Sequence, residues 1–185
     1  MSYKLIDKNG EKITFHDLQD KGPWYVAGKT SETVFVNKYG KKLGLILNPK
    51  KKFDNYTADL VNVSTNNLAE LKTRNTPFFQ TVERYSIDPQ YAVTFNVKDF
   101  LRYLKFYPGI EVYYWIDWIA VKLVSKTNIE VKPMEGVWKI TLGNIKVLSE
   151  SAPIHTYQQR ILDARGSAKK SYVFDLSNPL FEKVV

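Results

Sequence analysis

Two carboxylates and a lysine, Asp59, Glu70 and Lys72, lie close enough along the chain to act together in chemistry. Side chains alternate between the two faces of a β-strand, so Glu70 and Lys72 should share one face. Ala69 and Leu71 should point the other way, into a core. Carboxylate oxygens are preferred ligands of Mg²⁺ and Mn²⁺, and a bound metal can activate water and stabilise the oxygen that leaves phosphorus. The residue types therefore suit metal-dependent phosphodiester chemistry.

Two short strands joined by a polar turn must position these side chains. Asp59 belongs to the first strand, and the turn covers residues 64–67. The second strand carries Glu70, and because paired strands lie about 4.8 Å apart, Asp59 should lie beside it. Lys72, on the same face as Glu70, is placed to hold an attacking water or to help deprotonate it. The alternative is a surface strand with a Glu–Lys pair and an unrelated Asp.

The chain also contains a competing set of the same residue types. Asp117 is followed by Glu130 and Lys132, and these too lie on predicted strands. Pro133 comes directly after this set, no helix follows it, and no helix with an inward-facing acid directly precedes it. The flanking elements therefore favour the first set.

A helix is predicted over residues 30–43, before the acidic strands, because apolar residues recur there with helical spacing. Glu32 extends the apolar stripe of this helix. The alternative is a first-turn Glu that complements the helix dipole. Gly40 is unfavourable within a helix, so the helix should end near it. A largely buried strand at residues 43–47 should follow.

The clearest helix in the chain is predicted over residues 96–106. Asn96 caps it, with Asp99 at the third position of a capping box. Its inward-facing residues should be Val97, Phe100, Leu101 and Leu104. Its outer face carries a basic stripe of Lys98, Arg102 and Lys105. This stripe either follows a DNA backbone or is simply solvated.

Strands account for much of the remaining chain. Residues 110–124 are almost entirely apolar, which predicts a central strand or a tight pair of strands. Hairpins are expected around the Asn-Gly turn at residues 9–10 and within residues 138–148. The fold class is therefore α/β (α+β), with a mixed central β-sheet flanked by helices and additional β-hairpins at the N- and C-terminal ends.

The composition is that of a globular protein with a basic surface. The chain has 185 residues, of which 44% are hydrophobic and 25% charged, and its formal net charge is +8. This length favours one domain with a hydrophobic core of its own. The positive charge favours a polyanion such as nucleic acid, because each neutralised phosphate releases counterions. An acidic membrane surface or simple solubility would explain the same charge.

The sequence also excludes several classes of protein. It contains no cysteine, which excludes disulfides and thiolate zinc sites. No apolar run reaches the roughly 18 to 20 residues that span a bilayer, and the N-terminus lacks the apolar core of a signal peptide. We therefore expect a cytoplasmic protein without a membrane partner.

The order of the predicted elements resembles the core of the PD-(D/E)xK nuclease superfamily, which includes type II restriction endonucleases and Holliday-junction resolvases. That order is a helix with Glu32, a strand, a strand with Asp59, a strand with Glu70 and Lys72, a helix and a strand. The stretch at residues 70–75, ELKTRN, is particularly similar to the active-site strands of restriction endonucleases.

The resemblance covers residues 30–124, about half of the chain, and implies a restriction-endonuclease-like catalytic core there. Residues 1–28 would form an N-terminal hairpin appendage to this core. Residues 125–185 would add strands and loops that contact DNA or form a dimer interface. Together these parts make up a single nuclease domain.

By this resemblance Asp59 and Glu70 hold Mg²⁺, for which Mn²⁺ can substitute. Lys72 is the catalytic lysine and Glu32 an accessory acid. The superfamily pattern has a proline before the first acid, where this chain has Ala58. The implied activity is a Mg²⁺-dependent endonuclease that hydrolyses double-stranded DNA. Because one small active site cuts one strand, we also expect a homodimer.

Basic and amide side chains outside the acidic set are expected to contact DNA. They are Arg74, Asn75, Gln80, Lys98, Arg102, Lys105, His155 and Arg160. A single histidine is more often structural than catalytic, so His155 is not expected to act in the reaction. The alternative functions are a non-catalytic DNA-binding protein with the nuclease fold, a junction-resolving or phage recombination nuclease, and a structural assembly protein.

Overall fold

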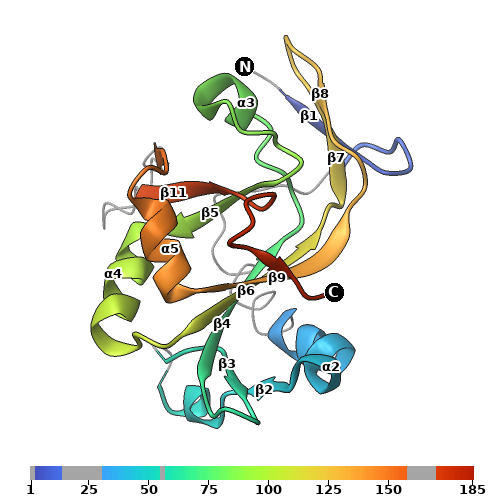
Figure 1. The fold of residues 1–185 in the computed structure, drawn as a ribbon. Helices are drawn as coiled ribbons and strands as arrows, with labels where there is room; N and C mark the ends of the chain where they lie inside the picture. The colour runs from blue at the N-terminus through green and yellow to red at the C-terminus, as the bar shows by residue number, and fades with distance from the viewer. Residues whose placement is uncertain (1–2, 14–30, 55–56, 158–169) are drawn as a thin grey trace.

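The computed structural model describes residues 3–13, 31–54, 57–157 and 170–185, which form an α+β fold (Figure 1). Its centre is a six-stranded sheet in the order β12-β9-β6-β4-β3-β2. The strands are β2 (Leu45–Leu47), β3 (Leu60–Asn62), β4 (Leu68–Arg74), β6 (Glu111–Asp117), β9 (Glu135–Thr141) and β12 (Glu182–Lys183). β4 and β6 are parallel, and the other neighbours in this sheet are antiparallel. The expectation of a mixed central sheet is confirmed.

The predicted elements around β4 occur in the predicted order, but a short helix and a strand that were not predicted lie between β4 and the helix over residues 97–106. A helix over residues 31–43 leads through β2 and β3 into β4. The chain then passes through α3 (Thr81–Tyr85), β5 (Ala92–Asn96) and α4 (Val97–Phe106) before it returns to the sheet as β6. This return makes the crossover that a parallel strand pair requires.

The helix over residues 31–43 changes its hydrogen-bonding pattern along its length. Residues 31–35 and α2 (Lys41–Leu43) are α-helical, whereas η1 (Val36–Gly40) between them is a π-helix. Short π-helical segments within α-helices occur frequently at functional sites. This one precedes β2 and the 3₁₀-helix η2 (Pro49–Lys52), which carries a lysine of the site described below.

Gly40 does not end this helix, which continues for three more residues to Leu43, the end of the predicted range. A Cβ at Gly40 would lie 2.6 Å from the carbonyl oxygen of Leu45 and 3.0 Å from Val36 Cγ1, so β2 packs directly on the helix backbone. The helix ends instead at Gly44, whose φ of 67° lies in the left-handed region that favours glycine.

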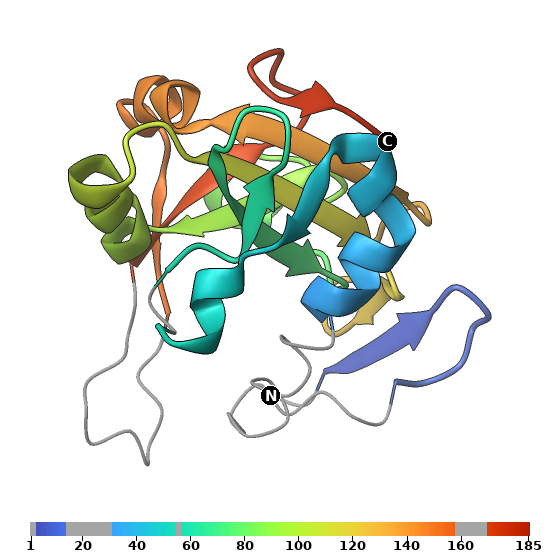
Figure 2. The same cartoon turned by 90° about the horizontal axis from the view of Figure 1, so that it is seen from below.

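The same helix lies across one face of the central sheet (Figure 2). Phe35 and Tyr39 pack on Trp115 of β6, with ring centres 5.8 and 6.0 Å from that residue. Ala69 and Leu71 of β4 are buried in this cluster. The predicted inward direction of these two side chains is therefore confirmed.

The opposite face of the central sheet is covered by α4, by α5 (Leu142–Ser149) and by a second sheet in the order β10-β11-β5. In this second sheet β10 (Ile154–Thr156) and β11 (Lys170–Asp175) are antiparallel. The core between these layers contains Phe95, Phe100, Tyr103, Ile145 and Phe174. The catalytic candidates on β4 therefore lie between the sheet and α4.

A third sheet contains β1 (Lys4–Asp7), β7 (Ala120–Val124) and β8 (Ile129–Glu130) in the order β1-β7-β8. The apolar run predicted at residues 110–124 is thus a pair of strands, β6 and β7, in different sheets. The predicted N-terminal turn is present, with Gly10 at a φ of 84°. Among the described residues, no helix is long and apolar enough to cross a membrane.

The hairpin expected at residues 138–148 is not formed. β9 ends at Thr141, and α5 begins with the next residue. The reason is a helix cap, because Thr141 Oγ1 accepts a hydrogen bond from the backbone nitrogen of Asn144 over 3.2 Å. The Gly-Asn pair that predicted a turn lies in the first turn of this helix, so the C-terminal part of the chain contains a helix as well as strands.

The burial pattern of two elements differs from the prediction. Leu101 and Leu104 of α4 are exposed, and the buried residues are Phe100 and Tyr103. The helix is turned so that Tyr103 reaches the polar side chains of β4, which are described below. β2 lies at the edge of the central sheet, and only its first residue is buried.

Candidate active site

Asp59 is held against β4 through its carboxylate. Its Oδ2 accepts a hydrogen bond from the backbone amide of Leu71 over 3.0 Å. Its carbonyl oxygen accepts another from the backbone amide of Asn48 over 2.9 Å. β3 and β4 are antiparallel, and Leu60 is paired with Ala69. Asp59, the residue before Leu60, therefore lies opposite Glu70, the residue after Ala69. The backbone therefore sets the place of this acid.

Glu70 and Lys72 lie side by side on the face of β4 that is opposite to Leu71. Lys72 Nζ donates to Glu70 Oε1 over 2.7 Å and to Asp99 Oδ2 over 3.3 Å. Its ammonium also lies 5.6 Å from the ring centre of Phe95. The prediction that Glu70 and Lys72 share one face is confirmed.

The helix α4 supplies three polar side chains to this group. Arg102 Nη2 lies 3.5 Å from Asp99 Oδ1 and donates to Tyr103 Oη over 2.8 Å. Tyr103 is buried, and burial, followed by the charge of Glu70, raises its pKa. We call these five side chains, Glu70, Lys72, Asp99, Arg102 and Tyr103, the Lys72 cluster.

Glu32 and Lys51 complete the site on the side of Asp59. Lys51 Nζ donates to Glu32 Oε1 over 2.6 Å and also to Asp59 Oδ1. All three side chains are largely withdrawn from solvent. We call Glu32, Lys51 and Asp59 the Lys51 cluster. The amide of Leu71 joins it to the Lys72 cluster.

The electrostatics of the Lys72 cluster favour a protonated lysine. Burial by itself lowers the pKa of Lys72, but the charges of Glu70 and Asp99 outweigh burial, and the pKa lies above its ordinary value. Burial raises the pKa of Glu70; the attraction of Lys72 opposes this, and the nearby charge of Asp59 raises the pKa further. Lys72 is therefore a charged hydrogen-bond donor.

The same balance holds in the Lys51 cluster. Burial lowers the pKa of Lys51, but the charges of Asp59 and Glu32 outweigh it, so the pKa lies above the ordinary value. The ammonium is therefore a permanent cation between two acids at neutral pH.

Two carboxylates of the Lys51 cluster are the residues that could act as ligands of a small divalent cation. Among the described residues, no group of three or more His, Cys, Asp or Glu side chains is arranged to hold a metal ion. Glu32 and Asp59 nevertheless converge on one cation, the Lys51 ammonium. Mg²⁺ keeps several waters and is usually bound through one or two carboxylates together with substrate phosphates, so these two acids match the protein's share of such a site. Glu70, the other expected ligand, faces Lys72 in this structure.

The remaining predicted residues lie around these clusters or away from them. Arg74 Nη2 donates to the carbonyl oxygen of Thr94 over 3.0 Å. Arg102 is engaged with Asp99 and does not form an outer stripe. The exposed residues of the predicted DNA-contact set are Asn75, Gln80, Lys98 and Lys105. Arg160 lies outside the described residues.

His155 is packed in an aromatic cluster and is only 8% exposed. Its Nδ1 lies 2.8 Å from Tyr85 Oη, and its ring centre lies 4.8 Å from that of Phe78 and 4.6 Å from that of Tyr157. Burial, and then the charge of Arg84, lowers the pKa of His155. A DNA contact through this side chain would require it to leave the cluster.

The competing set of residues does not assemble into a second site. Asp117 ends β6 in the central sheet, whereas Glu130 lies on β8 in the third sheet. Glu130 Oε2 is paired with Lys122 Nζ over 3.1 Å. The backbone amide of Lys132 donates to Gln90 Oε1 over 2.7 Å. Asp117 and Glu130 of the competing set therefore lie in different sheets.

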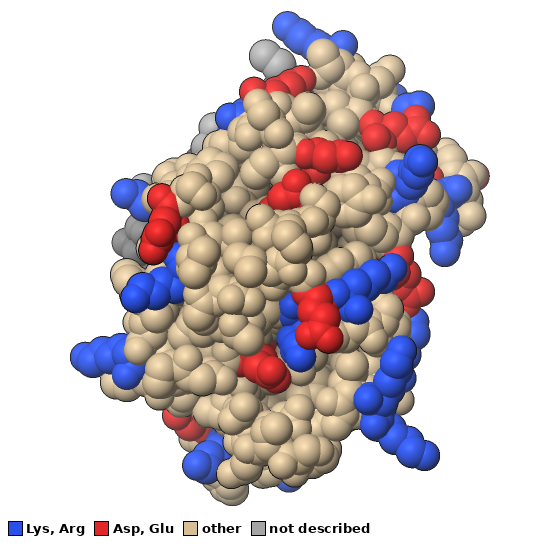
Figure 3. Space-filling model, in the orientation of Figure 1, with Lys and Arg blue, Asp and Glu red and all other residues tan. Residues whose placement is uncertain are grey.

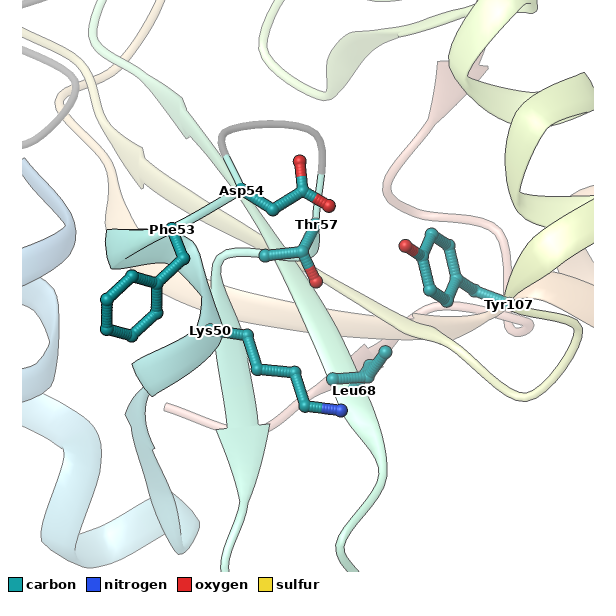
Figure 4. Close-up of a pocket in the computed structure, with 6 residues that line it drawn as sticks. All are labelled: Lys50, Phe53, Asp54, Thr57, Leu68 and Tyr107. Carbon is teal, nitrogen blue, oxygen red and sulfur yellow. The ribbon is translucent and has the colours of Figure 1, made fainter.

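The surface has a hollow whose lining includes Lys50, the residue before Lys51, and Thr57, which lies two residues before Asp59. It has a volume of about 430 Å³ and is lined by Lys50, Phe53, Asp54, Thr57, Leu68 and Tyr107 (Figure 4). Phe53 is 93% exposed, and its ring points away from Tyr107 (Figure 4). On the face seen in Figure 3, the described basic and acidic side chains are interspersed.

Three members of the two clusters were not identified as site residues from the sequence. Lys51 lies in a run of three lysines, a pattern that is typical of a solvated loop. Asp99 was predicted only as a capping residue. Tyr103 gave one usable signal, because it lies four positions after Asp99 and so on the same face of the helix.

Comparisons of the chain with protein-family models, curated proteins and solved structures give no match.

Proposed function

We propose that the protein is a Mg²⁺-dependent DNA endonuclease with a restriction-endonuclease-like core. The observation that carries this proposal is the hydrogen bond from the Leu71 amide to Asp59, which holds this acid beside the strand that carries Glu70 and Lys72. The order of the helix, the three strands, α4 and β6 supports the same proposal. Glu32 adds a further acid from the first helix.

The chain's own residues have distinct roles in the proposed reaction. Asp59 and Glu32 would hold a divalent metal, which when bound supplies an activated water and neutralises charge at phosphorus. Lys72 remains protonated because of Glu70 and Asp99, so it orients the attacking water or a phosphate oxygen by hydrogen bonding. Glu70, whose pKa is raised by burial, is better suited than Lys72 to accept a proton.

Cleavage of plasmid, linear, nicked and branched DNA with Mg²⁺ or with a chelator tests the proposal. We expect cleavage only with Mg²⁺ or Mn²⁺, and we expect Glu70→Gln and Lys72→Met each to slow it at least about 100-fold while DNA binding is retained. Glu130→Gln and Lys132→Met are matched controls, because they change the same residue types in the unassembled set. Cleavage that persists in both purified site variants contradicts the proposal.

A non-catalytic DNA-binding protein is the second candidate function. The observation in its favour is that Lys51 already neutralises Glu32 and Asp59, as in a structural ion-pair network. Binding measured across salt concentrations, together with the absence of cleavage in every metal, would support this candidate. Affinity should then fall by about 0.9 log units per tenfold salt for each neutralised phosphate. Affinity that is independent of salt would contradict both candidates.

The proposed enzyme acts as a homodimer, since a two-strand cut by a small nuclease requires two active sites. Sedimentation equilibrium of the free protein and of its DNA complex measures this directly. Two copies per duplex are expected, and a single copy that cuts both strands would contradict the dimer.

A further inference from the structure

The Lys51 ammonium lies between Glu32 and Asp59, the two acids that would hold the metal of the proposed function. Its nitrogen contacts one oxygen of Glu32 and one oxygen of Asp59, so the two acids share a single cation. A divalent ion on the same oxygens would meet the ammonium at contact distance, and the two positive charges would repel each other strongly in this partly buried place. The ammonium and the metal therefore exclude each other.

The position of Lys51 is fixed by a buried asparagine. Asn48 caps η2, because its Oδ1 accepts from the backbone amide of Lys50 over 3.1 Å. The Asn48 side-chain Nδ2 donates to the carbonyl oxygen of Ala58 over 2.9 Å, and the Asn48 backbone amide donates to the carbonyl oxygen of Asp59. Asn48 thus joins the segment that carries Lys51 to the segment that carries Asp59. The contact of Lys51 with Asp59 follows from this backbone arrangement.

The two neighbouring lysines show that this arrangement is specific to Lys51. Lys50 and Lys52 lie on the same short 3₁₀-helix and are exposed, whereas Lys51 turns inward. The Lys51 side chain is 22% exposed, so part of it contacts solvent.

We propose that Lys51 is an internal cation that competes with the divalent metal for Glu32 and Asp59 and must swing out before the metal binds. This inference rests on the metal dependence of the proposed function. The ammonium stabilises the two acids in the absence of metal, and it lowers the affinity of the site for Mg²⁺ and Mn²⁺. Lys51 thus sets the metal concentration at which Glu32 and Asp59 bind the ion.

Direct titration with Mn²⁺, followed by the electron paramagnetic resonance signal of the free ion, tests the inference. Lys51→Met should bind Mn²⁺ about tenfold more tightly than the unmodified protein, which corresponds to about 1.4 kcal/mol. Lys50→Met and Lys52→Met are matched controls on the same helix and should bind within about twofold of the unmodified protein. Equal or weaker binding by the folded Lys51→Met protein, or no binding by either protein, overturns the inference.

A second measurement keeps the test valid if Lys51→Met does not fold. In the unmodified protein with ¹³C at lysine Cε, Mg²⁺ should shift the Lys51 signal and leave those of Lys50 and Lys52 in place. Signals are assigned with single Lys→Gln variants. A Lys51 signal that does not move while the site fills with metal overturns the inference.

Neither measurement involves DNA, so the two proposals fail separately. Tighter Mn²⁺ binding by Lys51→Met without DNA cleavage by the unmodified protein would contradict the nuclease and retain the competing lysine. Metal-dependent cleavage with an unchanged Mn²⁺ affinity in Lys51→Met would overturn the competing lysine alone.

Discussion

Asp59 Oδ2 accepts a hydrogen bond from the amide nitrogen of Leu71 over 3.0 Å, and this contact joins the Lys51 cluster to the Lys72 cluster. The amide belongs to the residue between Glu70 and Lys72, whose side chains point to the face opposite to that of Leu71. The distance between the acid and the Glu–Lys pair is therefore set by backbone geometry. Flexible side chains alone would not hold such an arrangement.

Removal of the Asp59 carboxylate should destabilise the fold. Asp59→Ala leaves the buried Leu71 amide without its acceptor and leaves the Lys51 ammonium with Glu32 alone, so we expect a loss of about 2 kcal/mol in the free energy of unfolding. Asp59→Asn keeps an oxygen acceptor for the amide and should lose less. Urea denaturation of the two variants measures the difference. Equal stability of Asp59→Asn and Asp59→Ala would show that the amide hydrogen bond contributes nothing.

Loss of the Lys72 ammonium should leave buried negative charge without compensation. Lys72→Met should lower the free energy of unfolding by about 3 kcal/mol near neutral pH, because Glu70 and Asp99 lose their shared cation. Burial already raises the pKa of Glu70, so the variant relieves the unpaired charge by protonation and its deficit should shrink as pH falls.

A double-mutant cycle tests this coupling between Lys72 and Glu70. Glu70→Gln removes the buried charge, so it should recover part of the stability when it is added to Lys72→Met. Chemical denaturation at several pH values provides the four free energies. Additive losses, or a Lys72→Met deficit that is the same at acidic and neutral pH, would show that the two side chains are not coupled.

His155 should make the stability dependent on pH in the mildly acidic range. Burial and the charge of Arg84 lower its pKa below the ordinary value of 6.5, so the unfolded chain binds a proton more readily than the folded protein. The contribution of neutral His155 to the free energy of unfolding is fully present above pH 6.5, the ordinary pKa. It is lost as pH falls through the lower pKa of the folded protein. His155→Gln does not titrate. Denaturation of both proteins between about pH 8 and about pH 5 should show that the free energy of unfolding of the unmodified protein decreases relative to that of His155→Gln as pH falls. A difference in this free energy that stays constant with pH would contradict the prediction.

Local patterns in the sequence predicted the parts of the site that depend on one element alone. Alternation along β4 placed Glu70 and Lys72 on one face and Leu71 on the other, because the period of a strand is set by its backbone. The Asn96 cap of α4 was predicted for the same reason, and its Oδ1 accepts from the backbone amide of Lys98 over 2.8 Å.

Local patterns failed where two local signals compete. Gly-Asn at residues 143–144 is compatible with a turn and with the first turn of a helix, and the cap from Thr141 decides for the helix. The inward face of α4 was assigned by hydrophobicity to Leu101 and Leu104. The helix instead turns Tyr103 inward, where its apolar ring is buried and its hydroxyl is hydrogen-bonded.

By itself, the sequence determined the helix and strands that lead into β4, the capped helix α4, and the pairing of Glu70 with Lys72 on one face. Only the tertiary structure decided that Asp59 and Glu32 share the Lys51 ammonium, and that Asp99 joins Lys72. It also decided that the competing set of the same residue types is divided between β6, which ends at Asp117, and β8, which carries Glu130. The physical reason is that ion pairs between residues distant in sequence depend on how sheets and helices pack, and residue spacing carries no information on that packing.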